Sequence, residues 1–460
     1  MHTLRSFFTR SPHSQTAILI AGFLILEAMY AWLGHLRNLE FFVVETIAVG
    51  LLGGVVYLLV MFGLEHTPES RNSFWLLLVA AVLFRVTLWP LVPTLSNDLY
   101  RYRWDGKAQL RGLNPYLVQP DDPKFDDLLN LNDNYELRMP AMDMPTIYPP
   151  LAEQVFKYTA RWLPATAAFK LPMEFCDILV MILLAAWLRA EGGRAYQLVI
   201  YAWNPLVVIE FAGSGHSDAL ALAALVGAFL IIKSRRTMST LLLAVATLLK
   251  SFPILLFPLW LRRNGWPRSA RAWLEGAAAA ALAAICAWPY RAALHQIPIT
   301  MATFERNWQD NNASLYTMLK IFSDSHEFAA GIGVGVTVGL AVWTALRKIE
   351  PTRAAFLILG SVLLFSPNAY PWYFTWVIPF LCFRPNPAWL LLTILQFLSY
   401  KVLIEYQDYG IFNFDPHYLA LTYIPFYAVL LWQVLRKNPV WVAPASLFTP
   451  NCEGPASDDR

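Results

Sequence analysis

The sequence TAILIAGFLILEAMYAWL (Thr16–Leu33) is soon followed by a second apolar run, VVETIAVGLLGGVVYLLVMFG (43–63). A helix needs about 20 mostly apolar residues to cross the hydrocarbon core of a bilayer. Similar runs recur along the 460 residues, of which 57% are hydrophobic and only 15% are charged. A soluble domain carries about 25% charged residues. The sequence therefore predicts an all-α polytopic membrane protein embedded in a lipid bilayer.

Apolar runs of suitable length continue to residue 435. Two stretches, 238–261 and 354–383, are too long for one straight helix, and each has a polar or proline break, at Lys250–Pro253 and at Ser366–Asn368. We interpret each as a pair of segments, which gives about 12–14 transmembrane segments in all. The single helices are expected near residues 17–34, 43–63, 74–95, 171–189, 196–213, 218–233, 272–288, 327–346, 387–404 and 418–435.

Lys and Arg gather in the loops on one side of this topology, as in KSRR (233–236) and RRNGWPRSAR (262–271). Basic loops stay on the cytoplasmic side of a membrane. The segment 96–164, which follows the third helix, is then a large extracytoplasmic loop. The net charge of +3 is spread along the chain without a basic block, so the sequence does not indicate a nucleic-acid partner.

The segment 96–164 contains 10 of the 32 acidic residues and many aromatic ones. A loop of this length inside a compact protein is usually functional or disordered. Its first carboxylate, Asp98, lies at the membrane–water boundary, where a base could reach a lipid headgroup and a water-side acceptor. On a helix Asp98, Arg101 and Asp105 share one face. This face suits a base beside a phosphate-binding guanidinium, or equally a helix cap with structural ion pairs to Arg101 or Arg103.

A second polar cluster is GSGHSD (213–218), which contains His216 and Asp218 and precedes an apolar helix. Ionisable residues at membrane depth often belong to functional sites, and a helix N-terminus can receive an anion. The structural alternative is that Asp218 caps the helix and His216 is an interfacial histidine. Lys250 lies between two short apolar segments and is a candidate phosphate ligand, or else it extends to the membrane surface.

The stretch FERNWQDNNASLY (304–316) supplies Arg306, Trp308 and Asn311. Amide, charged and indole groups together are typical of a sugar-facing surface, although they also suit a solvated loop. The chain has no GxxxxGK[ST], GxSxG or HExxH motif and no clustered histidines, so an ATP-driven pump, a serine hydrolase and a zinc protease are not indicated.

The chain resembles the GT-C superfamily of integral-membrane glycosyltransferases, and within it the bacterial polyprenol-phosphate-mannose-dependent mannosyltransferases. The matching stretches occur in the family's order and cover roughly residues 74–384. They are NDLYRYRWDGKAQLRGLNPY (97–116), YPPL (148–151), WNPLVVIEFAGSGHSDALAL (203–222), LLKSFPILLFPLWLRR (248–263) and SPNAYPWYFTWVIPF (366–380).

The resemblance implies transfer of a hexose, with mannose favoured, from a polyprenyl-phosphate-linked donor to a glycolipid or glycan acceptor. It implies inversion at the sugar, an active site on the extracytoplasmic side of a bacterial inner membrane, and an aspartate general base, which is Asp98 here. The family usually reaches its catalytic loop after one helix, whereas three precede it here. No cofactor or metal is implied, although the acids of the loop leave a divalent ion open.

The resemblance divides the chain into N-terminal helices (1–73), a catalytic membrane core (74–384), C-terminal helices (385–436) and a cytoplasmic tail (437–460). Candidates for binding the donor phosphate are cationic or imidazole groups, namely Arg101, Arg103, His216 and Lys250. Candidates for other substrate contacts are Asp105, Tyr148, Asp218, Arg306, Trp308, Asn311 and Tyr370.

Two other functions remain as alternatives. A transporter or flippase would explain the many helices and the broken segments, but it should contain an internal repeat, and none is recognisable. A polymerase or ligase of surface glycans would share the membrane setting, but it would have its large outer loop late in the chain rather than early.

Overall fold

The computed structural model describes residues 12–68, 71–130, 133–309, 311–409 and 415–436. These residues form helices and loops, with no β-strand among them beyond an isolated bridge between Asn38 and Val92. The predicted tail 437–460 lies outside the described residues. The all-α prediction is confirmed for the part of the chain that can be described.

The principal helices follow one another along the whole chain. Their bounds are α2 Pro12–Leu36, α3 Val43–Glu65, α4 Arg71–Leu88, α5 Asp98–Leu110, α6 Pro150–Trp162, α7 Thr166–Phe169, α8 Leu171–Ala190, α9 Val199–Ala202, α10 Pro205–Val208, α11 Asp218–Leu230, α12 Arg236–Leu249, α13 Phe257–Arg263, α14 Ala270–Ala287, α15 Gln296–Asn307, α16 Ser314–Ser323, α17 His326–Leu346, α18 Pro351–Phe365, α19 Ile378–Leu381, α20 Pro387–Leu395, α21 Val402–Tyr409 and α22 Pro416–Leu435.

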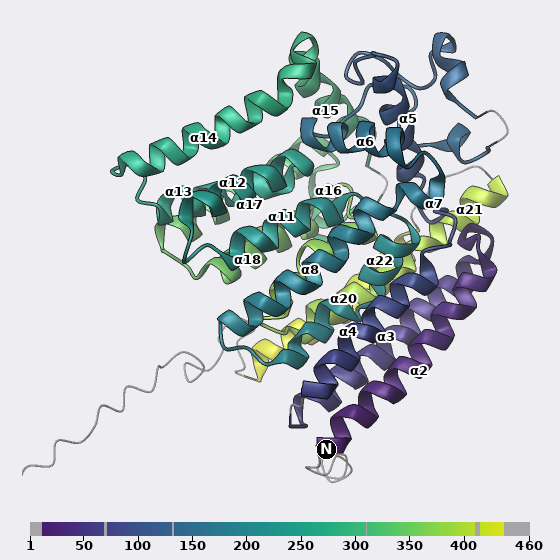
Figure 1. Cartoon of the computed structure of the whole chain (residues 1–460), viewed down its shortest axis with the longest axis vertical. Helices are drawn as coiled ribbons and strands as arrows, with labels where there is room; N and C mark the ends of the chain where they lie inside the picture. Colours follow the sequence, from purple (N-terminus) through teal and green to yellow (C-terminus); the bar gives the residue numbers. More distant parts are fainter. Residues whose placement is uncertain (1–11, 69–70, 131–132, 310, 410–414, 437–460) are drawn as a thin grey trace, which may run out of the picture.

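The long helices form one bundle. Helix α2 packs against α3 and α4, α8 packs against α11, and α11 packs against α12. The main hydrophobic core of the described residues extends from Leu19 to Phe426, and a smaller one around Tyr100 and Trp104 lies within the segment 96–164. Figure 1 shows α5, α6 and α15 gathered at one end of this bundle, whereas α2 begins at the other end. The segment 96–164 is therefore a folded layer on one end of the bundle, built around α5 packed on α6.

Fewer helices than expected are long enough to cross a bilayer unaided. Among the described residues, seven helices satisfy the length and hydropathy required, or eight if a bent pair of helices counts as one span. Four of the expected segments contain apolar helices of only 10–17 residues, so seven or eight candidate spans stand where about 12–14 transmembrane segments were predicted. The seven are Ser14–Leu36, Leu39–Glu65, Thr166–Ala190, Ala270–Ala293, His326–Leu346, Pro387–Gln407 and Pro416–Leu435, and the four short helices are Asn72–Leu88, Asp218–Leu230, Arg236–Leu249 and Pro351–Phe365.

Two expected breaks are confirmed and one was missed. Helix α12 ends at Leu249, where Lys250 is extended, and α18 ends before the Ser366–Asn368 turn. The segment 196–213, expected to be one helix, bends by 54° between Ala202 and Pro205. Proline disfavours the α conformation in the residue before it, and the Asn204 side chain caps the new helix by accepting a hydrogen bond from the Leu206 N–H.

A buried ion pair joins α4 to α8 inside the bundle. Arg85 and Asp177 are both fully buried, with Arg85 Nε 2.5 Å from Asp177 Oδ2. Tyr201 Oη donates to Asp177 Oδ1 at 2.7 Å, and Arg85 Nη1 donates to the Ala202 carbonyl at 2.9 Å. These partners satisfy charges that would otherwise be costly at this depth, and they hold the bent segment 195–213 against both helices.

Asp177→Ala should strongly destabilise the protein, because it leaves the Arg85 guanidinium buried without its carboxylate. Removing one partner of a buried pair costs about 3–5 kcal/mol. Thermal unfolding in detergent measures the change. The matched control is Glu191→Gln, which removes an ion pair with the exposed Lys233 and should cost about 0–1 kcal/mol. Equal destabilisation by both substitutions would contradict this account.

Candidate active site

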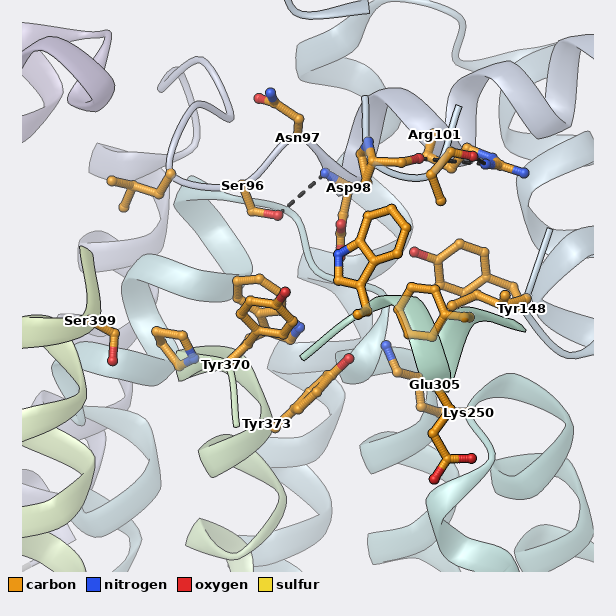
Figure 2. A pocket seen from close by; sticks show the side chains of 18 of the residues that line it. Ser96, Asn97, Asp98, Arg101, Tyr148, Lys250, Glu305, Tyr370, Tyr373 and Ser399 are labelled. Carbon is orange, nitrogen blue, oxygen red and sulfur yellow. Dashed lines mark hydrogen bonds between the residues drawn. The ribbon is translucent and has the colours of Figure 1, made fainter. Parts of the chain in front are cut away.

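A cavity of about 790 Å³ lies between the folded segment 96–164 and the end of the bundle. Figure 2 shows Asp98, Tyr148, Lys250, Tyr370 and Tyr373 around this space. Its charged lining residues come from five separate parts of the chain, and they are Glu40, Asp98 and Arg101 of α5, Arg138, Lys250 and Glu305. A concave site with a few convergent polar groups is the usual form of a binding site.

Asp98 is the first residue of α5 and lines the cavity. Its side chain is 17% exposed. Tyr102 Oη donates to Asp98 Oδ2 at 3.4 Å, and the Asp98 N–H donates to Ser96 Oγ at 3.3 Å. Burial raises the pKa of Asp98 to about 6, while the nearby Lys250 opposes this rise. The carboxylate therefore combines access to the cavity with a basicity suited to accepting a proton near neutral pH.

Lys250 and Asp218 form a charged pair at the floor of the cavity. Lys250 Nζ lies 3.0 Å from Asp218 Oδ2, and Trp376 Nε1 donates to Asp218 Oδ1 at 2.6 Å. The ammonium also lies 5.7 Å from the centre of the Tyr148 ring and 5.5 Å from that of Tyr373. Because Lys250 lines the cavity and Asp218 lies fully buried behind it, the ammonium is the part of this pair that a ligand can reach.

Aromatic rings form much of the remaining wall. Tyr370 stacks on Trp372 at 4.8 Å, and Tyr373 packs on Trp376 at 4.7 Å. Flat apolar faces beside polar groups are suited to sugar rings. The aromatic lining residues are Tyr148, Phe304, Trp308, Tyr370, Trp372, Tyr373, Trp376, Tyr400 and Tyr406.

The arginines of α5 are held by protein groups. Arg101 Nε donates to both oxygens of the buried Asp105 at 3.1 Å, and its other nitrogens donate to the carbonyls of Ala141 and Met144 at 2.5 and 3.1 Å. Arg101 lines the cavity, whereas Asp105 does not. Arg103 lies outside the lining and pairs with Glu136 at 3.2 Å. These arginines of α5 therefore bind other parts of the segment 96–164 and stabilise its fold.

His216 and Glu210 lie behind the cavity wall. The ring of His216 stacks on Trp372 at 4.1 Å and is almost fully buried. Its Nδ1 lies 3.6 Å from Asp98 Oδ2, and its Nε2 lies 3.3 Å from Glu210 Oε2. Tyr400 Oη donates to the other oxygen of Glu210. His216 therefore contacts the cavity only through its neighbours.

The stretch 304–316 divides between the cavity and the surrounding structure. Trp308 and Glu305 line the cavity, whereas Arg306 and Asn311 do not. Asn311 Nδ2 donates to the Ala369 carbonyl at 2.8 Å, and the Ala369 N–H donates back to the Asn311 carbonyl at 2.6 Å. Asn311 thus supports the turn that carries Tyr370.

Two charged groups of the lining, Glu40 and Arg138, were not among the predicted site residues. Glu40 accepts from Arg138 Nη1 at 2.7 Å and from Nη2 at 3.1 Å. Arg138 also lies over the rings of Tyr135 and Tyr406. Glu40 stands alone at the edge of an apolar run, and its partner lies 98 residues away, so no local pattern marks the pair. Among the described residues, no three His, Cys, Asp or Glu side chains gather as metal ligands.

Comparison with known families identifies the chemistry. Residues 8–262 match the family model described as the N-terminal domain of alpha-(1→6)-mannopyranosyltransferases, which covers more than half of the chain. The chain belongs to this family. Residues 317–437 match a second model, the MptB C-terminal domain. The expected GT-C resemblance is confirmed, and the chain is a membrane mannosyltransferase rather than a transporter.

One curated relative of this mannosyltransferase is alpha-(1→6)-mannopyranosyltransferase A of Mycobacterium tuberculosis. The two are 23% identical over 419 residues, which cover 82% of this chain and 76% of the relative. No solved structure matches the chain.

Gly106→Val should separate α5 from α6 in the mannosyltransferase. A Cβ at Gly106 would lie 2.5 Å from the Phe156 carbonyl oxygen and 2.7 Å from Ala160 Cβ, so the helices must move apart and carry Asp98 with them. We expect faster proteolysis within 96–164 and a loss of mannosyl transfer. The control is Gly339→Val on α17, where a Cβ meets nothing within 4 Å. Unchanged proteolysis and activity in Gly106→Val would contradict the close packing.

Proposed function

We propose that the protein transfers mannose from a polyprenyl-phosphate-mannose donor to a hydroxyl of a glycan or glycolipid acceptor, with inversion and with Asp98 as general base. The observation that carries the proposal is the position of Asp98, a partly buried carboxylate with a pKa of about 6, on the wall of a cavity lined by aromatic rings and Lys250. The name of the M. tuberculosis relative supports formation of an α-(1→6) linkage.

In the reaction, the acceptor oxygen attacks C1 of the mannose while the bond from C1 to the phosphate oxygen breaks. Asp98 takes the proton of the attacking hydroxyl, and the electron pair of the broken bond leaves with the polyprenyl phosphate. Inversion requires the acceptor and the leaving phosphate to lie on opposite faces of the sugar. A base on the acceptor side and a cation on the phosphate side therefore complete the arrangement.

Lys250 is the group that we assign to the leaving phosphate. Its one carboxylate partner among the described residues, Asp218, is shared with Trp376, so the ammonium keeps donors for a further oxygen. Arg101 is less available, because Asp105 and loop carbonyls occupy its guanidinium. A fixed positive charge in a partly dry cavity stabilises the negative charge that develops on the phosphate.

The lining suggests where each substrate enters. Helix α15 contributes Pro298, Met301, Ala302 and Phe304 to the cavity, and Ile299 and Met301 are exposed on its surface. An apolar wall that continues onto an exposed apolar helix suits the polyprenyl tail. Ser399 lies on the other side of Tyr370 and Tyr373 from Lys250 and Glu305 (Figure 2). The ion pair of Glu40 and Arg138, beside the Tyr406 ring, also lines the cavity and suits the hydroxyl groups of an acceptor.

We infer that the cavity faces the extracytoplasmic side. The basic segment 233–236 lies at the end of the bundle where α8 ends, because Lys233 pairs with Glu191. Arg194, in the turn after α8, donates to the carbonyls of Glu65 and Thr67 at the end of α3. The cavity lies at the other end, with α5 and α15 (Figure 1). The distribution of basic residues supports a cytoplasmic position for the first end.

Asp98→Asn should reduce mannosyl transfer by about 10²–10⁴-fold, because the amide cannot accept the hydroxyl proton. The assay uses proteoliposomes, polyprenyl-phosphate-mannose with a labelled sugar, and a synthetic mannoside acceptor. The matched control is Asp127→Asn, which neutralises an exposed acid of the same segment that pairs with Arg111 and should retain full activity.

Full activity of Asp98→Asn would exclude Asp98 as the base. If wild type and variant both fail with this donor but transfer another lipid-linked sugar, the choice of mannose fails instead. NMR of the product in the same assay compares its anomeric configuration with that of the donor, and retention would exclude the single displacement.

The activity should fall as the pH is lowered through about 6, because Asp98 must be ionised to act as a base and burial raises its pKa to about 6. We expect kcat/KM to be nearly constant above pH 7 and to fall about tenfold per unit well below pH 6. An ordinary aspartate titrates near pH 4. A profile that stays flat from pH 7 to pH 5 would contradict the raised pKa.

A further inference from the structure

We propose that His216, held by Glu210 and Tyr400, is a positioning residue that donates a hydrogen bond to the Asp98 carboxylate and keeps it ionised and aligned. The proposal rests on Asp98 as the base. From its residue type, His216 was expected to bind the donor phosphate. The proposal gives it a different role, behind the cavity wall.

The first support is the placement of the imidazole. His216 is 1% exposed, does not line the cavity, and stacks on Trp372 with a ring separation of 4.1 Å. A phosphate in the cavity cannot reach a ring that Trp372 covers. The two ring nitrogens face carboxyl groups instead, with Nδ1 3.6 Å from Asp98 Oδ2 and Nε2 3.3 Å from Glu210 Oε2.

The second support is a set of buried polar atoms whose hydrogen bonds are incomplete. Three atoms make no hydrogen bond within the described residues: both ring nitrogens of His216, and the Oε2 of Glu210 that faces them. Buried polar atoms are rarely left unpaired, and hydrogen bonds of catalytic groups are often long without substrate. A small movement of His216 toward its two neighbours would close both gaps.

While Asp98 is ionised and His216 is uncharged, only one arrangement of protons satisfies every atom. Asp98 accepts, so His216 Nδ1 must carry the proton and Nε2 must accept. Glu210 must then donate to Nε2 as an uncharged carboxyl group, and its other oxygen accepts from Tyr400 Oη. An uncharged Glu210 is consistent with its complete burial and with the absence of a Lys or Arg ion pair to it among the described residues. The chain of donors therefore points from Tyr400 to Asp98.

This hydrogen bond favours the charged form of Asp98, because a donor stabilises a carboxylate more than a carboxylic acid. It also fixes which oxygen of Asp98 turns toward the cavity. Other titratable or charged groups act on Asp98 from the surrounding elements and remain in all the variants below. They are Tyr102 of α5, Tyr148 of the folded segment, Asp218 of α11, Lys250 after α12 and Tyr373 of the 371–376 turn.

The test compares four variants in the proteoliposome assay, with kcat, donor KM and the pH profile as readouts. His216→Leu removes the donor to Asp98. We expect kcat to fall at least about tenfold, the acidic limb to move up by about one pH unit, and donor KM to stay within about twofold. His216→Gln retains an amide donor and should recover part of both losses. The control His326→Gln, which alters a histidine bonded to Tyr316, should match the wild type.

Glu210→Gln distinguishes the direction of the chain. An amide can donate to His216 Nε2 and accept from Tyr400, so this variant should retain kcat and the position of the acidic limb better than His216→Leu does. If Glu210 is instead an anion that accepts from Nε2, the amide would force the wrong tautomer and reduce kcat by orders of magnitude. That result would overturn the proposed arrangement.

The proposal also fails if His216→Leu raises donor KM and leaves the acidic limb in place, since this is the behaviour of a phosphate ligand. If His216→Leu does not fold, the same readouts in His216→Gln decide, and a wild-type profile there overturns the proposal. The result for Asp98→Asn separates the two proposals. If Asp98→Asn is active, Asp98 is not the base and both proposals fail. If Asp98→Asn is inactive but the His216 variants behave like the wild type, only the role of His216 is excluded.

Discussion

The cavity depends on one buried charge, the carboxylate of Asp218. Asp218 is fully buried at the start of α11, where an unpaired charge would be strongly destabilising. Lys250 comes from the break after α12, and Trp376 comes from the turn that follows α18. Since both must reach Asp218, three distant parts of the chain meet at one point. The half-length helices α11, α12 and α18 end or begin near this point, and the floor of the cavity forms there.

Several parts of this arrangement could be predicted because polar, charged or proline residues stand out in apolar stretches of the sequence. Lys250–Pro253 and Ser366–Asn368 interrupt long apolar stretches, and polar or proline residues in such places need a structural reason. Asp98 is the first acid after the third apolar run. The same logic reached Lys250, whereas the composition of 304–316 reached Trp308, and the stretches that resemble the family reached Tyr148 and Tyr370. All four line the cavity.

Other features depend on contacts that no local pattern encodes. Helical spacing correctly places Arg101 and Asp105 on one face of α5. It cannot show that Arg101 donates to the carbonyls of Ala141 and Met144 rather than to a ligand. Glu40 and Arg138 pair across 98 residues of sequence. The number of full spans was overestimated because apolar composition does not distinguish a complete span from a short helix buried by its neighbours, such as α11.

For the base that we propose, the position of Asp98 would reconcile two opposing demands at a membrane surface. A fully exposed aspartate would be too weak a base near neutral pH, whereas a fully buried one would be cut off from a water-side acceptor. Asp98 is largely covered by the folded segment and the bundle, but its carboxylate remains open to the cavity. In the function that we propose, the apolar lining from α15 would receive the lipid-linked donor, and the polar lining from Glu40 and Arg138 would receive the glycan acceptor. Separate approaches are what a displacement with inversion requires, because the incoming and leaving groups must occupy opposite faces of the same carbon.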